Sequence, residues 1–195
     1  GSRAWTVLVQ DINHVEAAAD ALLRQFRFIP HARLDDLMAS YASAGGGVGP
    51  HVDSYDVFLL QGEGERRWQI SHQRDLSLVP DAPIKLLDKF VPEFEWVLQP
   101  GDMLYLPPGI AHCGTAVSNC VTYSIGFRAP SNASLQQGLL RFLEDRCEDL
   151  GLYADPEMRP SVHPGAINQH FLAYCQRILE QVKWTHSDMA IFLGQ

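Results

Sequence analysis

Hydrophobic and polar residues follow two different periods along this chain. Residues 14–26 (HVEAAADALLRQF) place apolar side chains three and four positions apart and are rich in alanine, which predicts an early helix. Between residues 34 and 130 the apolar residues instead fall in short runs, separated by glycine, proline and aspartate. Several short strands at such spacing are typical of a β-sandwich or barrel.

The strand-like runs define the predicted β core. We expect strands within 34–43, 56–62, 66–71, 94–102, 103–109 and 121–130. Phe94, Trp96 and Tyr105 lie in these runs, and large aromatic side chains at such positions are most simply explained as core residues. No stretch repeats another, so the runs are expected to form one β domain.

Helical spacing returns after the β runs. Residues 134–151 and 168–184 carry apolar side chains at helical spacing, and Gly151 is placed to cap the first of these helices. The chain is therefore predicted to be mainly β with flanking helices. A β domain with an N-terminal helix is expected over residues 1–130, and a helical segment over residues 131–195.

Composition and charge narrow the classes of function. With 195 residues, 46% of them hydrophobic and 19% charged, the chain is long enough to bury a core and is not typical of disorder. The formal net charge of −8 argues against direct nucleic-acid binding, which needs a basic face, and suits a basic partner. No stretch approaches the roughly 18 to 20 apolar residues of a membrane-spanning helix, so no membrane association is expected.

The cysteines and the start of the chain carry two smaller indications. Cys113, Cys120, Cys147 and Cys175 form no CxxC pair, which favours reduced thiols in a cytoplasmic compartment. The chain begins with Gly-Ser rather than methionine, from which we expect a segment of a longer protein.

The stretch GPHVDSYDVF contains a candidate metal-binding pair. Residues two apart on a strand point to the same face, so His51, Asp53 and Tyr55 are expected to project together. Alone, such a pair is more often the polar end of a strand than a metal site. His112 follows a Pro-Pro-Gly turn that would return the chain across the barrel. His51, Asp53 and His112 together match a 2-His-1-carboxylate triad, which leaves open positions on Fe(II).

A run of glycines precedes this pair. Gly45, Gly46, Gly47 and Gly49 could suggest a phosphate-binding loop, but no Gly-Lys-Ser/Thr follows them and no helix begins there. Flexibility or a close approach of two backbone segments beside the metal is the better prediction.

The residues around His112 resemble a known motif. The spacing of Gly101, Pro107, Gly109 and His112 is similar to the second cupin motif, and His-x-Asp in place of the cupin His-x-His is typical of the JmjC class of 2-oxoglutarate oxygenases. More narrowly, residues 35–71 and the motif stretch resemble the bacterial ribosomal oxygenases, which hydroxylate an arginine in a large-subunit ribosomal protein.

This resemblance implies a fold, a reaction and partners. The fold would be a JmjC-type double-stranded β-helix (jelly-roll or cupin). The reaction would be an Fe(II)-dependent protein hydroxylation that uses 2-oxoglutarate and O2 as co-substrates, with catalysis at the three predicted metal ligands. The resemblance also implies a basic ribosomal protein substrate, a cytoplasmic location and a homodimer formed through the late helices. The family carries further residues before the core and a winged-helix-like region after it.

Binding of 2-oxoglutarate would require a buried cation for its distal carboxylate. In the run EGERRWQIS, Arg66 shares parity with Trp68 and Ile70 and is expected to point inward, whereas Arg67 is expected to face solvent. Arg66 also follows His51 by the 15 residues at which JmjC-type oxygenases place this cation. Arg66 is therefore the predicted co-substrate ligand.

Further residues are assigned to the co-substrate and to the substrate. Thr122 and Ser124 alternate on the strand after His112 and could give the co-substrate a hydroxyl contact, although inward hydroxyls often only bond the backbone. By resemblance, Asp36 would pair with a substrate guanidinium, while Met38 and Tyr55 would pack against its methylenes. A strand-start aspartate and a core methionine are the alternatives.

Two other functions fit the same residues. A hydroxylase of another residue, such as histidine, would use the same metal site, but Asp36 suits a cation better. A non-catalytic cupin-like binding module with a structural metal would need a fourth protein ligand. His72 and Cys113 are the near candidates, and neither is convincing. For the late helices, a lid within one chain is the alternative to a homodimer.

Overall fold

The structure, a computed structural model, describes residues 4–148, 151–156 and 158–194. The chain divides into two compact units, residues 1–129 and residues 130–195. No helix in the described part of the chain has the length and the apolar character needed to cross a membrane. The four cysteines, all of them described, are free thiols.

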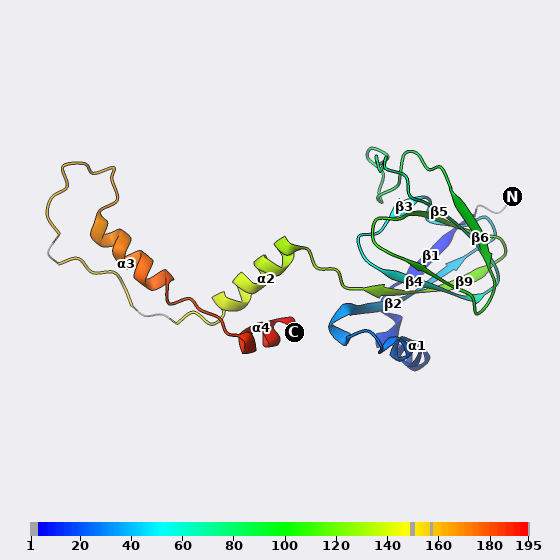
Figure 1. The fold of residues 1–195 in the computed structure, drawn as a ribbon, viewed down its shortest axis with the longest axis horizontal. Helices are drawn as coiled ribbons and strands as arrows, with labels where there is room; N and C mark the ends of the chain where they lie inside the picture. The colour runs from blue at the N-terminus through cyan, green and yellow to red at the C-terminus, as the bar shows by residue number, and fades with distance from the viewer. Residues whose placement is uncertain (1–3, 149–150, 157, 195) are drawn as a thin grey trace. The chain divides into compact units, whose positions relative to one another are not determined.

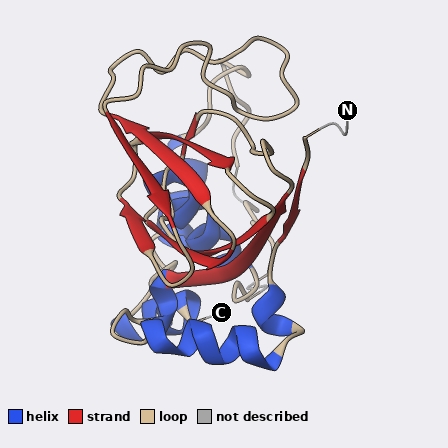
Figure 2. Cartoon of the chain, turned by 90° about the vertical axis from the view of Figure 1, so that its right-hand side faces the viewer, coloured by secondary structure: helices blue, strands red, loops and turns tan. Residues whose placement is uncertain are grey.

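The first unit consists of two antiparallel sheets (Figures 1 and 2). One has the strand order β1 (Thr6–Val9), β2 (Leu34–Ala42), β9 (Cys120–Phe127), β4 (Val57–Glu63) and β7 (Met103–Leu106). The other has the order β3 (His51–Val52), β8 (Ala111–Ala116), β5 (Arg66–Ser71) and β6 (Phe94–Leu98). The prediction of a mainly β fold with helices beside it is confirmed.

The alternation of side chains along the strands explains why the two sheets pack together. One core cluster draws its side chains from both sheets: Val57, Leu59, Trp68, Leu98 and Leu106. Inward residues of β4 and β5 alternate with outward ones, as the period of two on a strand requires. Residues that face inward on these strands therefore share the interior with any polar site built there.

A second core lies on the other face of the larger sheet. Its buried members are Ala19, Phe26, Leu34, Leu37, Ile125 and Phe127. Ala19 and Phe26 come from α1 (Ala17–Leu23) and the 3₁₀ turn η2 (Arg24–Phe26), and the other four come from β2 and β9. Two further 3₁₀ turns, η1 (Ile12–His14) and η3 (His31–Arg33), precede and follow these helical elements in the chain. Strands β2 and β9 are consequently covered on both faces, which fixes the wall of the interior that they form.

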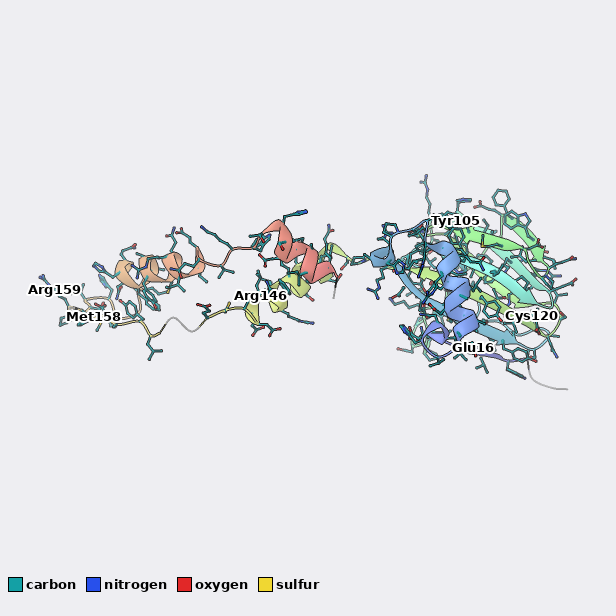
Figure 3. The ribbon with its side chains drawn as sticks, turned by 90° about the horizontal axis from the view of Figure 1, so that it is seen from below. Glu16, Tyr105, Cys120, Arg146, Met158 and Arg159 are labelled. Carbon is teal, nitrogen blue, oxygen red and sulfur yellow. The ribbon has the colours of Figure 1, made fainter. Side chains whose placement is uncertain are left out.

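The predicted N-terminal helix is shorter than its pattern suggested. The α-helical part spans Ala17–Leu23, and 3₁₀ turns occupy much of the remaining predicted range. Glu16, labelled in Figure 3, caps its start because its carboxylate accepts a hydrogen bond from the Ala18 N–H. Strand β1, a four-residue edge strand, was not among the predicted strands.

The second unit contains α2 (Asn132–Glu144), α3 (Gln169–Leu179) and α4 (His186–Leu193). The prediction that a helix extends from residue 134 to a cap at Gly151 is wrong about where the helix ends. Helix α2 ends at Glu144, and its C-cap is Asp145. Residues 149 and 150 of that predicted helix lie outside the described residues. Helix α4 was not predicted from the sequence, because its eight residues show little helical periodicity. The helix begins with a capping box formed by Thr185 and Asp188.

Helices α2 and α4 pack against each other. The rings of Phe142 and Phe192 lie 5.8 Å apart, and Gly138 leaves the space that Phe192 occupies. Arg146, labelled in Figure 3, forms an ion pair with Asp188 at 2.6 Å.

Three aromatic residues predicted to be core are exposed. Phe94 and Trp96 on β6 are 49% and 42% exposed, and Tyr105 on β7 is also exposed. Strands β6 and β7 are each the last strand of their sheet, so these side chains have no neighbouring strand on one flank. Phe94 and Trp96 stack on each other instead, with ring centroids 5.9 Å apart.

Candidate metal and co-substrate site

Two histidines meet across the short ladder between β3 and β8. His51 pairs directly with His112, and their ring centroids are 4.2 Å apart. Directly opposite residues on antiparallel strands project to the same face, so the register alone brings the two imidazoles together. His112 is buried and His51 is half-buried.

Asp53 reaches the histidines from beyond the end of β3. The prediction that His51, Asp53 and Tyr55 project from one strand is wrong, because β3 ends at Val52. The Pro-Pro-Gly turn holds Asp53 instead: the Gly109 N–H donates to the Asp53 carbonyl at 2.9 Å. The Asp53 carboxylate oxygen Oδ2 still lies 3.9 Å from His51 Nε2 and 3.6 Å from His112 Nε2.

Backbone carbonyls determine which nitrogen of each imidazole faces Asp53. His51 Nδ1 lies 2.9 Å from the Gly49 carbonyl, and His112 Nδ1 lies 2.9 Å from the Ile110 carbonyl. A carbonyl only accepts, so Nδ1 carries the proton in both rings and Nε2 of the neutral ring keeps a lone pair. Burial lowers the pKa of His112 below its usual range, and the neighbouring His51 lowers it further. Both effects favour the neutral, metal-binding form of His112.

The three side chains fit a divalent metal ion. Their ligand atoms all lie within 4.8 Å of one another. Histidine and carboxylate ligands lie about 2.0–2.2 Å from such an ion, so small side-chain adjustments would let one ion contact all three. Among the described residues the cluster has three members. His72, considered above as a fourth ligand, is not one of them, and its Nδ1 lies 2.9 Å from the Glu93 carboxylate. A three-ligand set leaves coordination positions open.

Arg66 is buried in the same interior with part of its guanidinium unpaired. Arg66 is 3% exposed, and its Nη1 donates a hydrogen bond to the Ser40 hydroxyl at 3.1 Å. Within the described residues, Nε and Nη2 have no hydrogen-bond partner. A buried cation with unpaired donors strongly favours an anionic ligand. Arg67 faces outward and pairs with Glu95 at 3.2 Å, as its parity predicted.

A cavity of about 380 Å³ is lined by the candidate metal ligands His51, Asp53 and His112 and by Arg66. Its polar and charged lining residues include Asp35, Asp36, Ser40, His51, Asp53, Tyr55, Arg66, His112 and Ser124, and Met38, Val57, Leu59 and Trp68 are among its apolar and aromatic ones. The sequence reasoning missed Ser40 and Trp68. The signal for Ser40 was present, since it shares parity with Asp36 and Met38 on β2.

Of the two hydroxyl residues predicted to contact the co-substrate, the structure brings one to the cavity. Ser124 lines it. The Thr122 hydroxyl donates to Gln61 Oε1 at 2.9 Å, and Thr122 is not among the lining residues. Gln61 in turn donates to the Glu63 carbonyl, so this pair joins β9 to β4 at a buried position.

The three residues predicted to bind substrate all line the cavity. Asp36 accepts a hydrogen bond from the Asp11 N–H at 3.0 Å, and partial burial raises the pKa of its carboxyl. Burial also raises the pKa of Tyr55 to about 12, and the charge of Asp53 adds to this rise. Met38 is half-buried between Asp36 and Ser40 along the inward face of β2.

The glycine run forms the loop before β3, and its backbone is hydrogen-bonded to the end of β8. The Gly45 N–H donates to the Ala116 carbonyl, and the Ala116 N–H donates to the Gly46 carbonyl, both at 2.8 Å. A Cβ atom on Gly47 would collide with the Gly114 carbonyl oxygen. The predicted close approach of two backbone segments is therefore present.

Comparisons with known proteins agree with this geometry. A model of the JmjC domain family matches residues 21–135. The chain is 41% identical over 168 residues to the ribosomal protein uL16 3-hydroxylase of Escherichia coli (strain K12), covering 86% of this chain and 45% of the relative. It is 40% identical over 151 residues to a probable ribosomal oxygenase of Haemophilus influenzae, covering 76% of this chain and 37% of the relative.

A solved structure shares the fold. The ribosomal oxygenase YcfD from Escherichia coli, in complex with cobalt and 2-oxoglutarate, superposes with a TM-score of 0.73 at 35% identity, covering 97% of this chain and 50% of that chain. The expected JmjC-type jelly-roll is therefore confirmed. This chain spans half or less of the length of each of these proteins.

Proposed function

The chain belongs to the JmjC domain family, and from this premise we propose that it is an Fe(II)- and 2-oxoglutarate-dependent protein hydroxylase acting on an arginine of a large-subunit ribosomal protein. The observation that carries the proposal is the presence, in one cavity, of a three-ligand metal cluster and a buried guanidinium with unpaired donors. Fe(II) bound there would supply the oxidative chemistry, in which O2, 2-oxoglutarate and a C–H group give succinate, carbon dioxide and a hydroxylated side chain.

His51, Asp53 and His112 are the proposed metal ligands. The carbonyls of Gly49 and Ile110 hold the two imidazoles with Nε2 directed toward Asp53 Oδ2, which supplies the negative charge. Such support from the backbone orients the ligands before the metal arrives. Open coordination positions are required for a keto acid and for O2.

Arg66 is the proposed ligand of the distal carboxylate of 2-oxoglutarate. Ser40 holds one end of the guanidinium, and the two unpaired nitrogens can donate side by side to one carboxylate. Ser124 lines the same cavity and is proposed as a further contact. A contact by Thr122 stays a prediction; its hydroxyl would have to leave Gln61.

Asp36, Met38 and Tyr55 are the proposed substrate residues. A half-buried carboxylate such as Asp36 is stabilised by an incoming guanidinium, which offsets its desolvation. The thioether of Met38 and the ring of Tyr55 offer apolar surface for the methylenes of the arginine. The name of the E. coli relative and the net charge of −8 support a basic ribosomal protein as substrate, and with it a cytoplasmic location.

A histidine target is the second candidate within the same chemistry. A neutral imidazole needs no buried carboxylate opposite it, so Asp36 favours arginine. Mass spectrometry of ribosomal proteins after incubation with enzyme, Fe(II), 2-oxoglutarate and O2 separates the two. The proposal requires one added oxygen atom on an arginine, and the same addition on a histidine would replace it.

The helical unit is proposed to form a homodimer. Among its described residues, the buried apolar side chains are those of Phe142 and Leu143 alone, while Leu140 and Leu179 are 67% and 69% exposed. Apolar surface of this extent normally has a partner. A second copy of the chain is the partner we propose.

The test of the metal and co-substrate assignment is spectroscopic and anaerobic. Fe(II) followed by 2-oxoglutarate should produce the visible charge-transfer band of a chelated keto acid. His51→Ala and Asp53→Ala should abolish the band and all turnover while leaving the folded circular dichroism spectrum. His72→Ala, which removes an exposed histidine outside the cluster, is the matched control. A folded wild-type protein without the band would favour the non-catalytic binding module.

A further inference from the structure

Trp68 is buried, and its indole N–H has no hydrogen-bond partner among the described residues. The residue is 5% exposed, whereas Trp5, Trp96 and Trp184 are all exposed. A buried indole N–H normally finds an acceptor, because an unpaired donor has lost its bonds to water without replacing them. The position of Trp68 therefore requires an explanation.

The unpaired donors in the described chain are concentrated in one place. Four buried side-chain polar atoms lack a partner there: Thr6 Oγ1, Arg66 Nε, Arg66 Nη2 and Trp68 Nε1. Three of the four belong to two residues on the inward face of β5, and both residues line the cavity that holds the proposed metal ligands. The guanidinium carbon of Arg66 lies 5.9 Å from the centre of the Trp68 ring. Three donors without an acceptor, two of them on the cationic guanidinium of Arg66, favour an anion between them.

The strand register places Trp68 between Arg66 and the metal ligands. Trp68 pairs with Gly114 on β8, two residues from His112, and Arg66 pairs two residues further away. The ring rests on Gly114, where an added Cβ would lie 2.7 Å from ring atoms Cη2 and Cζ3. The bare backbone at Gly114 thus admits the ring and limits its movement. A ligand that extends from the metal to Arg66 must pass Trp68.

We infer that Trp68 Nε1 is a further donor to the distal carboxylate of the dicarboxylate co-substrate. This inference rests on the proposed function. A carboxylate offers about four lone-pair sites, and the two free nitrogens of Arg66 occupy two of them. The indole N–H donates to a third lone-pair site from a different direction, and this bond fixes the rotation of the carboxylate. Trp68 is on this basis a co-substrate-binding residue in addition to a packing residue.

Calorimetry on the full chain tests the inference. The protein is loaded with Mn(II), which does not consume the co-substrate, and titrated with 2-oxoglutarate and with succinate. Trp68→Phe retains an aromatic ring but removes the donor, and should weaken both affinities about tenfold, equivalent to about 1.4 kcal/mol. Trp96→Phe is the matched control, because Trp96 is the direct cross-strand neighbour of Trp68 and lies outside the cavity lining. Its affinities should equal those of the wild type.

A second measurement needs no variant of Trp68. In the Zn(II)-loaded protein labelled with ¹⁵N, the indole signals of the three exposed tryptophans are assigned by their loss in Trp5→Phe, Trp96→Phe and Trp184→Phe. The remaining signal belongs to Trp68 and should move downfield when succinate binds, while the other three stay in place. A Trp68 signal that does not respond to saturating succinate overturns the inference, even if Trp68→Phe fails to fold.

The outcomes separate the inference from the proposed function. A wild-type protein that binds metal but not 2-oxoglutarate overturns the proposed function and the inference together. A wild-type protein that binds 2-oxoglutarate, with Trp68→Phe within about twofold of it, overturns the inference alone.

Discussion

At the scale of single residues, Arg66 and Arg67 are chain neighbours with opposite surroundings. Arg66 is buried and lines the same cavity as the proposed metal ligands, and Arg67 pairs with Glu95 on the outer face of the same strand. The period of two on a strand accounts for the difference. The pair therefore supplies its own control, since both substitutions remove one positive charge from the same strand.

Arg66→Ala should raise the concentration of 2-oxoglutarate needed for half-maximal turnover by about 10- to 100-fold, because charge-assisted hydrogen bonds to one carboxylate are lost. Arg67→Ala should leave that concentration unchanged, since its side chain is directed to solvent. Steady-state kinetics with varied 2-oxoglutarate measures both. Equal effects of the two substitutions would move the co-substrate role away from Arg66.

His112 gives the metal-free protein a pH dependence. Burial lowers the pKa of His112 from 6.5, so below that pH the unfolded chain binds a proton that the folded protein does not. The free energy of unfolding should therefore fall as the pH drops below about 6.5, by up to about 1.4 kcal/mol per pH unit for one group. Urea unfolding with a chelator at about pH 7.5 and about pH 5.5 measures this. In His112→Gln the pH dependence should be smaller; an identical dependence would contradict the assignment.

At the scale of elements, the site depends on contacts between segments that are not strands. Strand β3 is only two residues long, and the glycine run before it and the Pro-Pro-Gly turn after β7 hold it in place. Gly47 is a tight contact between this loop and β8, because an added Cβ would meet the backbone of Gly114 rather than a movable side chain. Displacement of this loop would displace His51.

Gly47→Ala should lower the free energy of unfolding by about 1–3 kcal/mol, the usual effect of overpacking, and should weaken metal binding. Urea denaturation and titration with Co(II) measure the two effects. Gly165→Ala is the matched control, since no atom lies within 4 Å of the added Cβ and the substitution should be neutral. Unchanged stability and metal affinity in Gly47→Ala would show that the loop adapts freely.

At the scale of the whole molecule, the two units differ in how much apolar surface they bury. The first unit has a core on both sides of its larger sheet, whereas most large apolar side chains described in residues 130–195 are exposed. The partner of that surface decides the oligomeric state. The proposed partner is a second copy of the chain.

Sedimentation equilibrium should therefore give twice the chain mass for the wild type. Leu140→Asp, which places a charge on an exposed apolar position of α2, should give a monomer. Ser134→Asp adds the same charge to the same helix about 120° away and should remain a dimer. A monomeric wild type would instead favour the helical lid within one chain.

The sequence by itself determined the local features of this protein. Alternation placed Arg66 inside and Arg67 outside, and the spacing of glycines and prolines identified the turn before His112. The short apolar runs identified most strands, and helical spacing identified two of the three later helices. These features depend on backbone geometry within a few residues, so they can be deduced from a single stretch of chain.

The tertiary structure decided everything that depends on neighbours distant in the chain. It placed Phe94 and Trp96 at an edge rather than in the core, because parity gives the face of a strand but not its rank in the sheet. It supported Asp53 through Gly109 rather than through a strand. It also left the Trp68 N–H without a partner, since hydrogen-bond partners are set by which segments meet and not by the alternation of one of them.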